Sequence, residues 1–143
     1  MDKITGEETR ACVHARIMSG THNGFIAYGD GQPVGWVNAG IKDNYRLIME
    51  NEEIGYDQEK KVGAIVCFVI DHKHRGKGIA KALLNAACKD FEDSGYDYIE
   101  AYPLKSPRNE AENYHGPLQM YLGYGFEITK ELENVSVVTK YLK

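Results

Sequence analysis

The nine-residue apolar run from Val62 to Ile70 constrains the fold of this chain more than any other feature of its sequence. Charged residues mark both of its ends, with Lys60-Lys61 before it and Asp71 after it. The run is far shorter than the roughly 20 apolar residues that span a bilayer, and a continuous apolar stretch of this length is typical of a strand covered on both faces. We therefore predict a buried strand at the centre of the fold, and no membrane partner.

A helix and a second strand are predicted to follow this buried strand. Ile79, Leu83 and Phe91 recur at helical spacing, and Gly95 interrupts the pattern. The stretch from Tyr96 to Tyr102 is aromatic and favours extended structure. The middle third of the chain is therefore expected to run strand, helix, strand.

Four shorter strands are predicted on either side of this unit. Residues 25–28 and 34–37 flank an Asp30-Gly31 pair, which favours a tight turn between antiparallel strands. Residues 126–128 and 135–141 alternate in strand fashion near the end of the chain. We expect all four strands to join the same sheet.

Two further helices are predicted from spacing and punctuation. Residues 5–19 place small and apolar side chains at intervals of four and three, and Gly20 follows them. Pro117 is suited to the first position of a short helix that runs through Tyr121, because proline lacks only an N–H group that has no helical partner there. Gly123 is expected to close that helix.

Composition limits the chain to one soluble domain, spanning residues 1–143. Of its residues, 43% are hydrophobic and 27% are charged, and the formal net charge of −4 argues against a nucleic-acid partner. The three cysteines, Cys12, Cys67 and Cys88, are odd in number and widely spaced, so we expect reduced thiols and no metal site. No apolar targeting segment begins the sequence, and a cytoplasmic location is the expectation.

The segment from His72 to Gly78 places basic residues where a helix N-terminus disfavours them. Arg75 and Lys77 would face the positive end of the helix dipole, and no clear capping side chain follows Asp71. A bound polyanion would accept hydrogen bonds from the free amides and pair with both cations, so we infer a site for a diphosphate or a similar group. A solvent-exposed basic turn without any ligand is the alternative.

Two motifs in the second half of the chain resemble those of one protein family. Arg75-Gly76-Lys77-Gly78-Ile79-Ala80 matches the [QR]-x-x-G-x-[GA] signature of the GNAT superfamily of acyl-CoA-dependent N-acyltransferases, and residues 121–126 resemble its downstream Y-x-x-x-G-F pattern. The similarity covers residues 62–142 well and the predicted hairpin, residues 24–41, loosely. Only about 23 residues precede that hairpin, so the strand and helix that the family carries there would be shortened.

The resemblance implies a fold and a set of site residues. It implies an α/β (α+β) fold with a mixed, mostly antiparallel sheet flanked by helices, in which two parallel strands splay apart to admit coenzyme A (CoA). Acetyl-CoA would be the cosubstrate, without any metal. Tyr121 would be the catalytic acid that protonates the departing thiolate, and a buried aromatic that only packs the short last helix is the alternative role. The implied cofactor-binding residues are Phe68, Val69, Ile70, Arg75, Gly76, Lys77, Gly78, Ile79 and Ala80.

The general base is not identified by the sequence. Many relatives carry a carboxylate early in the strand before the phosphate loop, whereas this chain has Gly63-Ala64-Ile65-Val66 there. Glu52, Glu53 and Glu100 are weak substitutes, because such acids more often lie at the surface or in salt bridges. Cys67 has only apolar neighbours and is expected to be an inert thiol, which favours direct transfer over an acyl-cysteine intermediate.

The leading hypothesis is an N-acetyltransferase that acts on a primary amine of a small molecule or peptide. A noncatalytic CoA-binding sensor or partner-binding module on the same fold is the alternative. A third possibility is a chain whose sheet is completed by a partner, and a homodimer is compatible with it. The sequence does not identify the acceptor.

Overall fold

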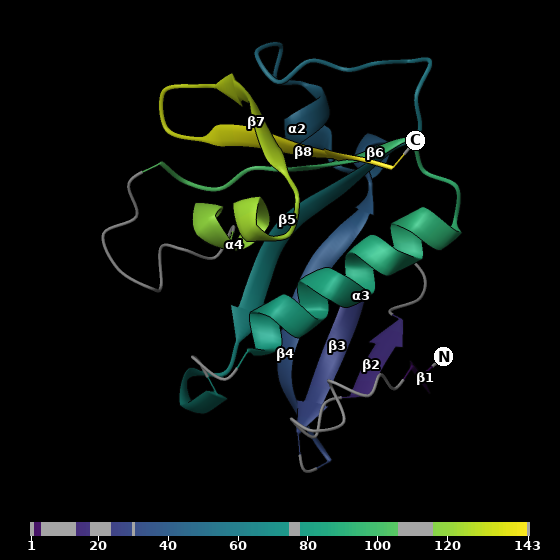
Figure 1. Cartoon of the computed structure of the whole chain (residues 1–143), viewed down its shortest axis with the longest axis vertical. Helices are drawn as coiled ribbons and strands as arrows, with labels where there is room; N and C mark the ends of the chain where they lie inside the picture. Colours follow the sequence, from purple (N-terminus) through teal and green to yellow (C-terminus); the bar gives the residue numbers. More distant parts are fainter. Residues whose placement is uncertain are drawn as a thin grey trace.

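The computed structural model describes residues 2–3, 14–17, 24–29, 31–74, 78–105 and 116–142. Within these residues, eight strands form one sheet in the spatial order β1-β2-β3-β4-β5-β6-β8-β7 (Figure 1). In that sheet β5 and β6 are parallel, and all other neighbouring strands are antiparallel. The predicted mixed, mostly antiparallel sheet flanked by helices is confirmed.

The predicted hairpin is formed by β3 (Gly24–Gly29) and β4 (Gln32–Ile41). Gly31 in the connecting turn has a φ of 79°, a conformation that glycine adopts without strain. Phe25 and Val37 are buried, so the hairpin contributes one apolar face to the core.

The helix predicted for residues 5–19 is wrong where the structure describes it. β2 (His14–Ile17) is a strand that pairs antiparallel with β3, and β1 (Asp2–Lys3) pairs with β2. Residues 14–17 also alternate polar and apolar residues, and pairing with the edge of β3 satisfies their backbone, which a short helix in water does poorly. The other residues of that predicted helix lie outside the described residues.

The central strand is β5 (Val62–Ile70), which has the predicted bounds and lies between β4 and β6 (Tyr98–Ala101). α3 (Ile79–Asp93) connects the two parallel strands and packs across β3, β4 and β5. Gly63 permits this close packing, because a Cβ atom there would lie 2.7 Å from the ring of Phe91. The expectation that β5 is covered on both faces fails at Val69, whose side chain is 56% exposed.

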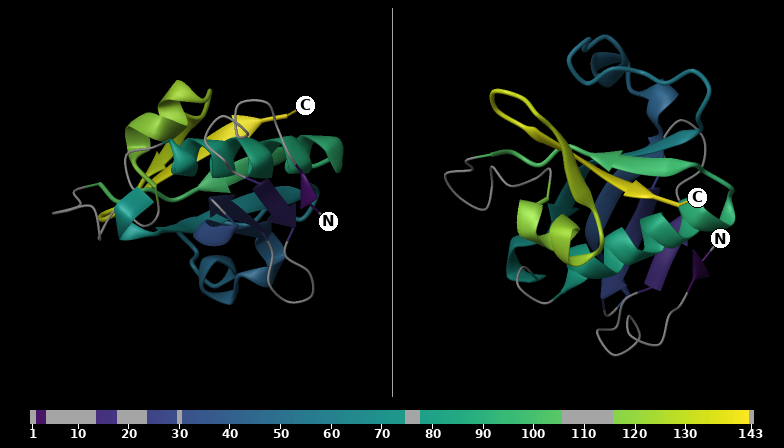
Figure 2. Two further views of the ribbon diagram at one scale, coloured as in Figure 1. Left: turned by 90° about the horizontal axis from the view of Figure 1, so that it is seen from below. Right: turned by 45° about the horizontal axis from the view of Figure 1, so that its top comes forward.

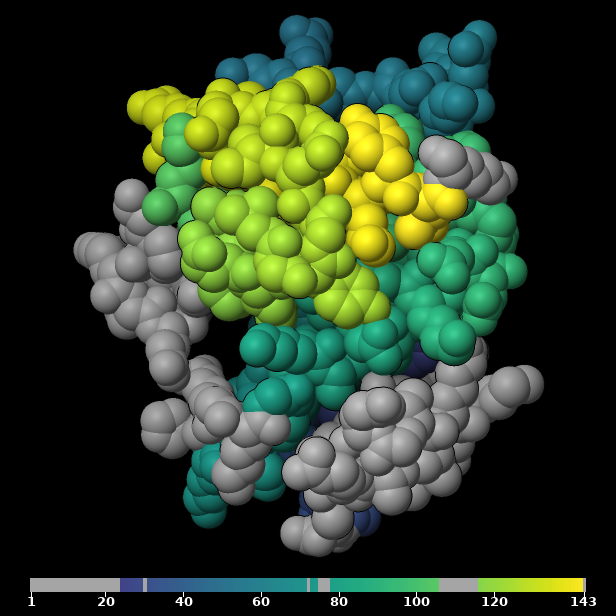
Figure 3. All heavy atoms as spheres, viewed as in Figure 1, coloured from purple at the N-terminus to yellow at the C-terminus, as the bar shows by residue number. Residues whose placement is uncertain are grey.

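The C-terminal elements complete the sheet beyond β6. α4 (Leu118–Gly123) is preceded by Pro117, which is its N-cap rather than its first residue. β7 (Glu127–Glu131) and β8 (Ser136–Tyr141) form a hairpin, with β8 beside β6. Figure 3 shows α4 and this hairpin as one continuous surface above α3.

Helices cover the sheet unequally on its two sides. α3 and α4 lie on one side, where the main core joins them to β3, β4 and β5 (Figure 2). On the other side lie η1 (Lys42–Asn44), α2 (Arg46–Met49) and the segment that leads to β5. A second cluster, made of Ile54, Ala64, Tyr102 and Val137, fills that side. In the described part of the chain, no helix is long and apolar enough to cross a membrane.

Candidate active site

The parallel strands β5 and β6 diverge half-way along β5. Their pairing runs from Val62 opposite Tyr98 to Ile65 opposite Ala101, and β5 then continues for five residues to Ile70. The chain after β6 turns toward the C-terminal hairpin instead, where the N–H of Ser136 donates to the carbonyl oxygen of Pro103 at 3.0 Å. The two parallel strands therefore separate after Ile65, as the family resemblance implies, and we call the region between the second half of β5 and the chain that follows β6 the slot.

A β-bulge lies at the point of divergence. Asn38 of β4 is opposite Cys67, whereas Ala39 is opposite Ile65, so Val66 is the extra residue. A bulge bends its strand and increases the local twist. The bend gives a physical reason for the end of the parallel ladder, and the apolar sequence of β5 did not reveal it.

The register of β4 and β5 fixes the direction of the backbone groups beyond the bulge. The N–H of Asp71 donates to the carbonyl oxygen of Val34 at 2.8 Å, and hydrogen-bonded pairs alternate along an antiparallel ladder. The backbone groups of Val69 therefore face β4, while those of Phe68 and Ile70 face the slot. The side chain of Phe68 packs into the core.

The N-terminus of α3 follows the slot-lining end of β5 along the chain, after residues 71–78. Its N-cap is Gly78, with a φ of 81°, and no side chain caps the helix there. The first turn contains no acidic residue, and Ile79 is buried while Ala80 is partly buried against the core. Predicted residues Arg75, Gly76 and Lys77 lie outside the described residues. The first amides of a long helix without a side-chain cap are suited to an anion.

Tyr121, the predicted catalytic acid, is completely buried on α4. Its ring packs edge-on against Phe126, with 5.2 Å between the ring centroids. Gly116 lies against its phenol, since a Cβ atom at that glycine would be 2.6 Å from the phenolic oxygen. Burial raises the pKa of Tyr121 well above its usual value, and the thiols of Cys88 and Cys67 add to the rise. The phenol is therefore neutral.

α4 is held on α3 by a side-chain hydrogen bond as well as by apolar packing. The hydroxyl of Tyr124 donates to Oδ1 of Asn85 at 2.5 Å. Leu118 and Met120 pack against the core that contains Leu83 and Leu84 of α3. Tyr121 is thus mounted on a helix that is fixed at both its apolar and its polar contacts.

The three glutamates considered as general bases differ in burial and in their partners. Glu52 and Glu53 are exposed. Glu100 is buried and pairs with Lys42 at 2.8 Å, and it accepts a hydrogen bond of 3.0 Å from the hydroxyl of Tyr102. The salt-bridge interpretation of Glu100 is confirmed, and its carboxylate is committed to these two partners.

Lys42 is the buried charge that sequence reasoning missed. Its ammonium pairs with Glu100 and donates to the carbonyl oxygen of Gly55 at 2.6 Å. Glu100 lies far from Lys42 in the sequence, and no local sequence pattern predicts the ion pair between them. It was detectable only as a lysine placed between an apolar strand and a short helix.

Asp71 and His74, which lie between β5 and α3 along the chain, interact with each other. Nδ1 of His74 lies 2.8 Å from Oδ2 of Asp71, and this hydrogen bond lowers the pKa of the Asp71 carboxyl. The interaction fixes the start of the segment between β5 and α3. Both side chains are partly or largely exposed to solvent.

Comparison with known proteins decides the family. Residues 4–116 match the sequence model of the acetyltransferase (GNAT) family. This chain belongs to the GNAT acetyltransferase family. The matched range includes β5 and α3, with Gly78 between them, and ends before Tyr121. No curated protein matches the chain.

Solved structures of other GNAT proteins share the fold. The NatC complex bound to Gag peptide and CoA has a TM-score of 0.62 at 19% identity, with 83% of this chain and 70% of that chain covered. The ribosomal-protein-S18-alanine N-acetyltransferase from Escherichia coli has a TM-score of 0.59 at 11% identity, over 88% and 72%. The PaiA N-acetyltransferase from Thermoplasma acidophilum in complex with coenzyme A has a TM-score of 0.56 at 16% identity, over 82% and 58%.

Proposed function

We propose that this protein is an N-acetyltransferase that moves an acetyl group from acetyl-CoA to a primary amine by direct attack. The observation that carries the proposal is the slot between β5 and the chain after β6, which opens beside the uncapped N-terminus of α3. An extended chain of amides and a terminal diphosphate are the two chemical parts that such a pair of surfaces suits.

The residues fit acetyl-CoA as a substrate in two places. Backbone groups of Phe68 and Ile70 face the slot and would pair with the amides of the pantetheine arm, as in an added strand. The exposed side chain of Val69, which lies on the other face of the sheet from the buried side chain of Phe68, would contact the same arm. The diphosphate would bind the first amides of α3, with Arg75 and Lys77 supplying positive charge.

The chemistry assigned to this chain centres on Tyr121. A neutral amine attacks the thioester carbonyl, the new C–N bond forms, and the tetrahedral intermediate expels the thiolate as the C–S bond breaks. The neutral phenol of Tyr121 gives its proton to that sulfur, and the phenolate regains a proton from water. The amine loses its own proton to water or to a base that the described residues do not identify, since Glu100 is bound to Lys42 and Tyr102.

The acceptor is proposed as an amine of a small molecule or of a peptide. Two relatives are named for peptide or protein substrates: one is solved with a Gag peptide, and the other is an alanine N-acetyltransferase of a ribosomal protein. These names support an amine acceptor as a class. A cytoplasmic location fits the free thiols of Cys67 and Cys88 among the described residues.

Calorimetric titration with acetyl-CoA tests the binding half of the proposal. We expect saturable binding, weaker binding of ADP, and binding of desulfo-CoA that shows the thioester end is dispensable. Arg75→Glu combined with Gly78→Asp should abolish binding through charge repulsion and a blocked approach. The matched control is Gly95→Asp combined with Lys89→Glu, because Gly95 also has a positive φ but lies beyond the other end of α3, and Lys89 is an exposed lysine near that end.

Thiol release with a panel of amines tests the catalytic half. Tyr121→Phe should lower turnover and leave the affinity for acetyl-CoA nearly unchanged. Binding without turnover on any amine would favour the CoA-binding module instead. Absence of binding by folded protein, or full binding by the double variant, would overturn the proposal.

A further inference from the structure

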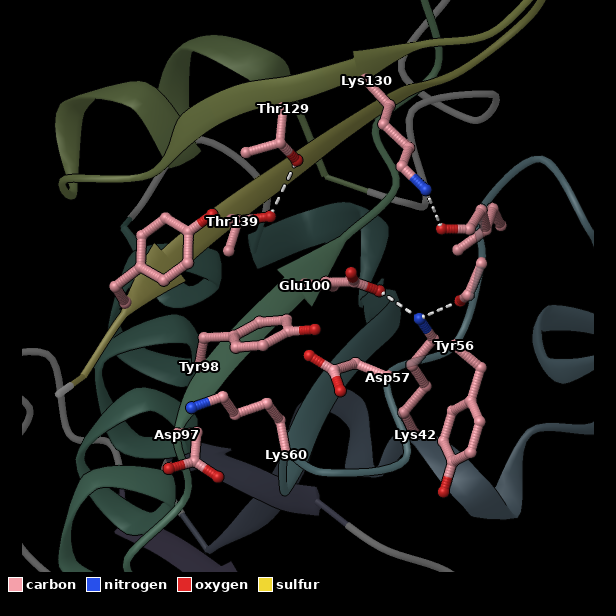
Figure 4. Close-up of a pocket in the computed structure, with 13 residues that line it drawn as sticks. Lys42, Tyr56, Asp57, Lys60, Asp97, Tyr98, Glu100, Thr129, Lys130 and Thr139 are labelled. Atoms are coloured by element: carbon pink, nitrogen blue, oxygen red, sulfur yellow. Dashed lines mark hydrogen bonds and ion pairs between the residues drawn. The ribbon is translucent and has the colours of Figure 1, made fainter.

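A cavity of about 610 Å³ lies away from the slot, on the side of the sheet opposite α3 (Figure 4). It is lined by Lys42, by the 54–60 segment, and by side chains of β6, β7 and β8. Tyr56, Tyr98 and Tyr141 all contribute to its wall, and we name it the tyrosine cavity. Its volume is within the range of small-molecule sites.

The walls of the tyrosine cavity are fixed by hydrogen bonds from two elements. Lys42 donates to the carbonyl oxygen of Gly55, and Lys130 of β7 donates to those of Glu53 and Ile54. The carbonyl groups of three consecutive residues, 53–55, thus accept hydrogen bonds from two ammonium groups. The cavity is therefore built into the fold and does not depend on a single loose loop.

The three lysines of the lining are already engaged or lie at its edge. Lys42 is paired with Glu100, and Lys130 is bound to the backbone carbonyls. The exposed side chain of Lys60 points toward Asp97 in Figure 4. Among the lining residues that the structure describes, Asp57 is a carboxylate without a lysine partner. Its Oδ1 accepts a hydrogen bond of 3.0 Å from the N–H of Glu59, and Figure 4 shows the carboxylate directed toward the phenol of Tyr98.

Aromatic faces and negative charge meet at Tyr98. Its ring lies 5.6 Å from that of Tyr141, measured between centroids. Burial raises the pKa of Tyr98 to about 12, and the charges of Glu100, Asp57 and Asp97 contribute to the same rise. The carboxylate of Asp57 and two aromatic rings thus line the same cavity.

A metal ion does not suit this arrangement. Within the described ranges, no three His, Cys, Asp or Glu side chains converge as metal ligands would. An organic ammonium ion needs no such convergence, because it combines one carboxylate with contact to aromatic faces. The volume also exceeds what a single ion would fill.

We propose that the tyrosine cavity binds an organic ammonium ion, with Asp57 as the counter-charge and Tyr98 and Tyr141 as the aromatic wall. The site does not use Phe68, Ile70 or the N-terminus of α3, so it is separate from the proposed acyl-transfer slot. Its occupancy would hold the 54–60 segment against the C-terminal hairpin.

Titration of ¹⁵N-labelled protein with n-butylammonium chloride tests the proposal, with spectra recorded at constant ionic strength. We expect saturable shifts of the amides of Asp57, Tyr98 and Thr139, and none at Phe68 and Ile70. Sodium butyrate and 1-butanol are the probes of matched size, and neither should saturate these amides.

Two pairs of variants sharpen the test. Asp57→Asn should weaken butylammonium binding about two- to fivefold, whereas Glu59→Gln, a nearby exposed acid outside the lining, should leave it unchanged. Tyr141→Leu should weaken it by a similar factor, and Tyr141→Phe should preserve it because the ring remains.

Several outcomes would overturn the proposal. Absence of saturation by butylammonium, or equal saturation by butyrate, would contradict a cation site. Equal affinities of Asp57→Asn and Glu59→Gln would remove Asp57 from it. Shifts centred on Phe68 and Ile70 would place the amine in the acyl-transfer slot and would likewise overturn the proposal.

Discussion

The two ends of the β5–β6 pair differ in how they are held together. At the first end, the strands are hydrogen-bonded from Val62 to Ile65, and a buried Lys42–Glu100 ion pair lies against them. At the second end, β5 runs on from Val66 to Ile70 with β4 as its neighbour, while the chain after β6 departs. One strand thus belongs to the core along its first half and forms the edge of the proposed acyl-transfer slot along its second.

The difference teaches where tolerance to substitution should be found. At the first end, which we call the closed end, side chains are packed on both faces of the sheet, so changes there act on stability. At the second end, which we call the open end, the proposed contacts with acetyl-CoA are made by backbone groups of Phe68 and Ile70 and by the exposed side chain of Val69. Changes there should act on substrate affinity while the free energy of unfolding stays nearly constant.

The largest expected effect is at the closed end, from Lys42→Met. Removing the ammonium leaves the Glu100 carboxylate buried without its counter-charge, which should cost about 3 to 5 kcal/mol of unfolding free energy. Urea denaturation measures it, and Lys60→Met is the control because Lys60 is an exposed lysine of the same cavity. Equal midpoints for the two variants would show that the pair does not close this end.

Ile65 and Val69 compare the two halves of β5 directly. Ile65→Ala removes a completely buried side chain and should destabilise the protein by about 2 to 4 kcal/mol. Val69→Ala, on a half-exposed side chain, should cost less than about 0.5 kcal/mol and raise the KM for acetyl-CoA a few-fold. Denaturation and steady-state kinetics measure both quantities, and the reverse pattern would break the comparison.

Gly116 tests how closely the phenol of Tyr121 is positioned at the open end. An alanine methyl group would collide with the phenolic oxygen, so Gly116→Ala should lower kcat about ten- to hundredfold with little change in KM. Gly95→Ala is the control, because Gly95 shares the positive φ of Gly116 while no atom lies within 4 Å of a Cβ atom there. In the Tyr121→Phe background, Gly116→Ala should cause no further comparable loss; an independent loss would assign its effect to the fold.

The smallest predicted effect concerns alkaline pH and Cys88 on α3. Burial raises the pKa of its thiol from 9.0 to about 12, so the unfolded chain ionises first. Stability should therefore fall as pH rises from about 9 to about 12, by about 1 kcal/mol at pH 10 from this group. Cys88→Ala should flatten that slope more than Cys67→Ala, since Cys67 is less buried. Urea denaturation at pH 8 and pH 10 measures how much unfolding free energy each variant loses between the two pH values. An equal loss in Cys88→Ala and Cys67→Ala would contradict this prediction.

Much of the fold could be predicted because local pattern and tertiary structure agree. β5 begins and ends where charged residues flank the apolar run, and α3 follows the spacing of Ile79, Leu83 and Phe91. The prediction failed at β2, where four residues satisfy both a helical and an alternating pattern. Pairing with the edge of β3 selects the strand there.

The candidate site could be predicted only in part from the sequence. The motif of residues 75–80 indicates the helix N-terminus, and its glycine at 78 does adopt the positive φ that such a turn needs. The bulge at Val66 could not be foreseen, because every residue around it is apolar and its cause is the register with β4. The Lys42–Glu100 pair and the tyrosine cavity depend on distant segments meeting across the sheet.

The bulge has a consequence for chain length rather than for residue type. Ile65 and Cys67 are opposite consecutive residues of β4, Ala39 and Asn38, so removing Val66 alone would leave every other partner of β5 in place. The ladder would become regular and the bend would lose its cause. A deletion of one codon would then turn a sheet whose parallel strands diverge into an ordinary closed one, without altering any residue proposed to touch acetyl-CoA.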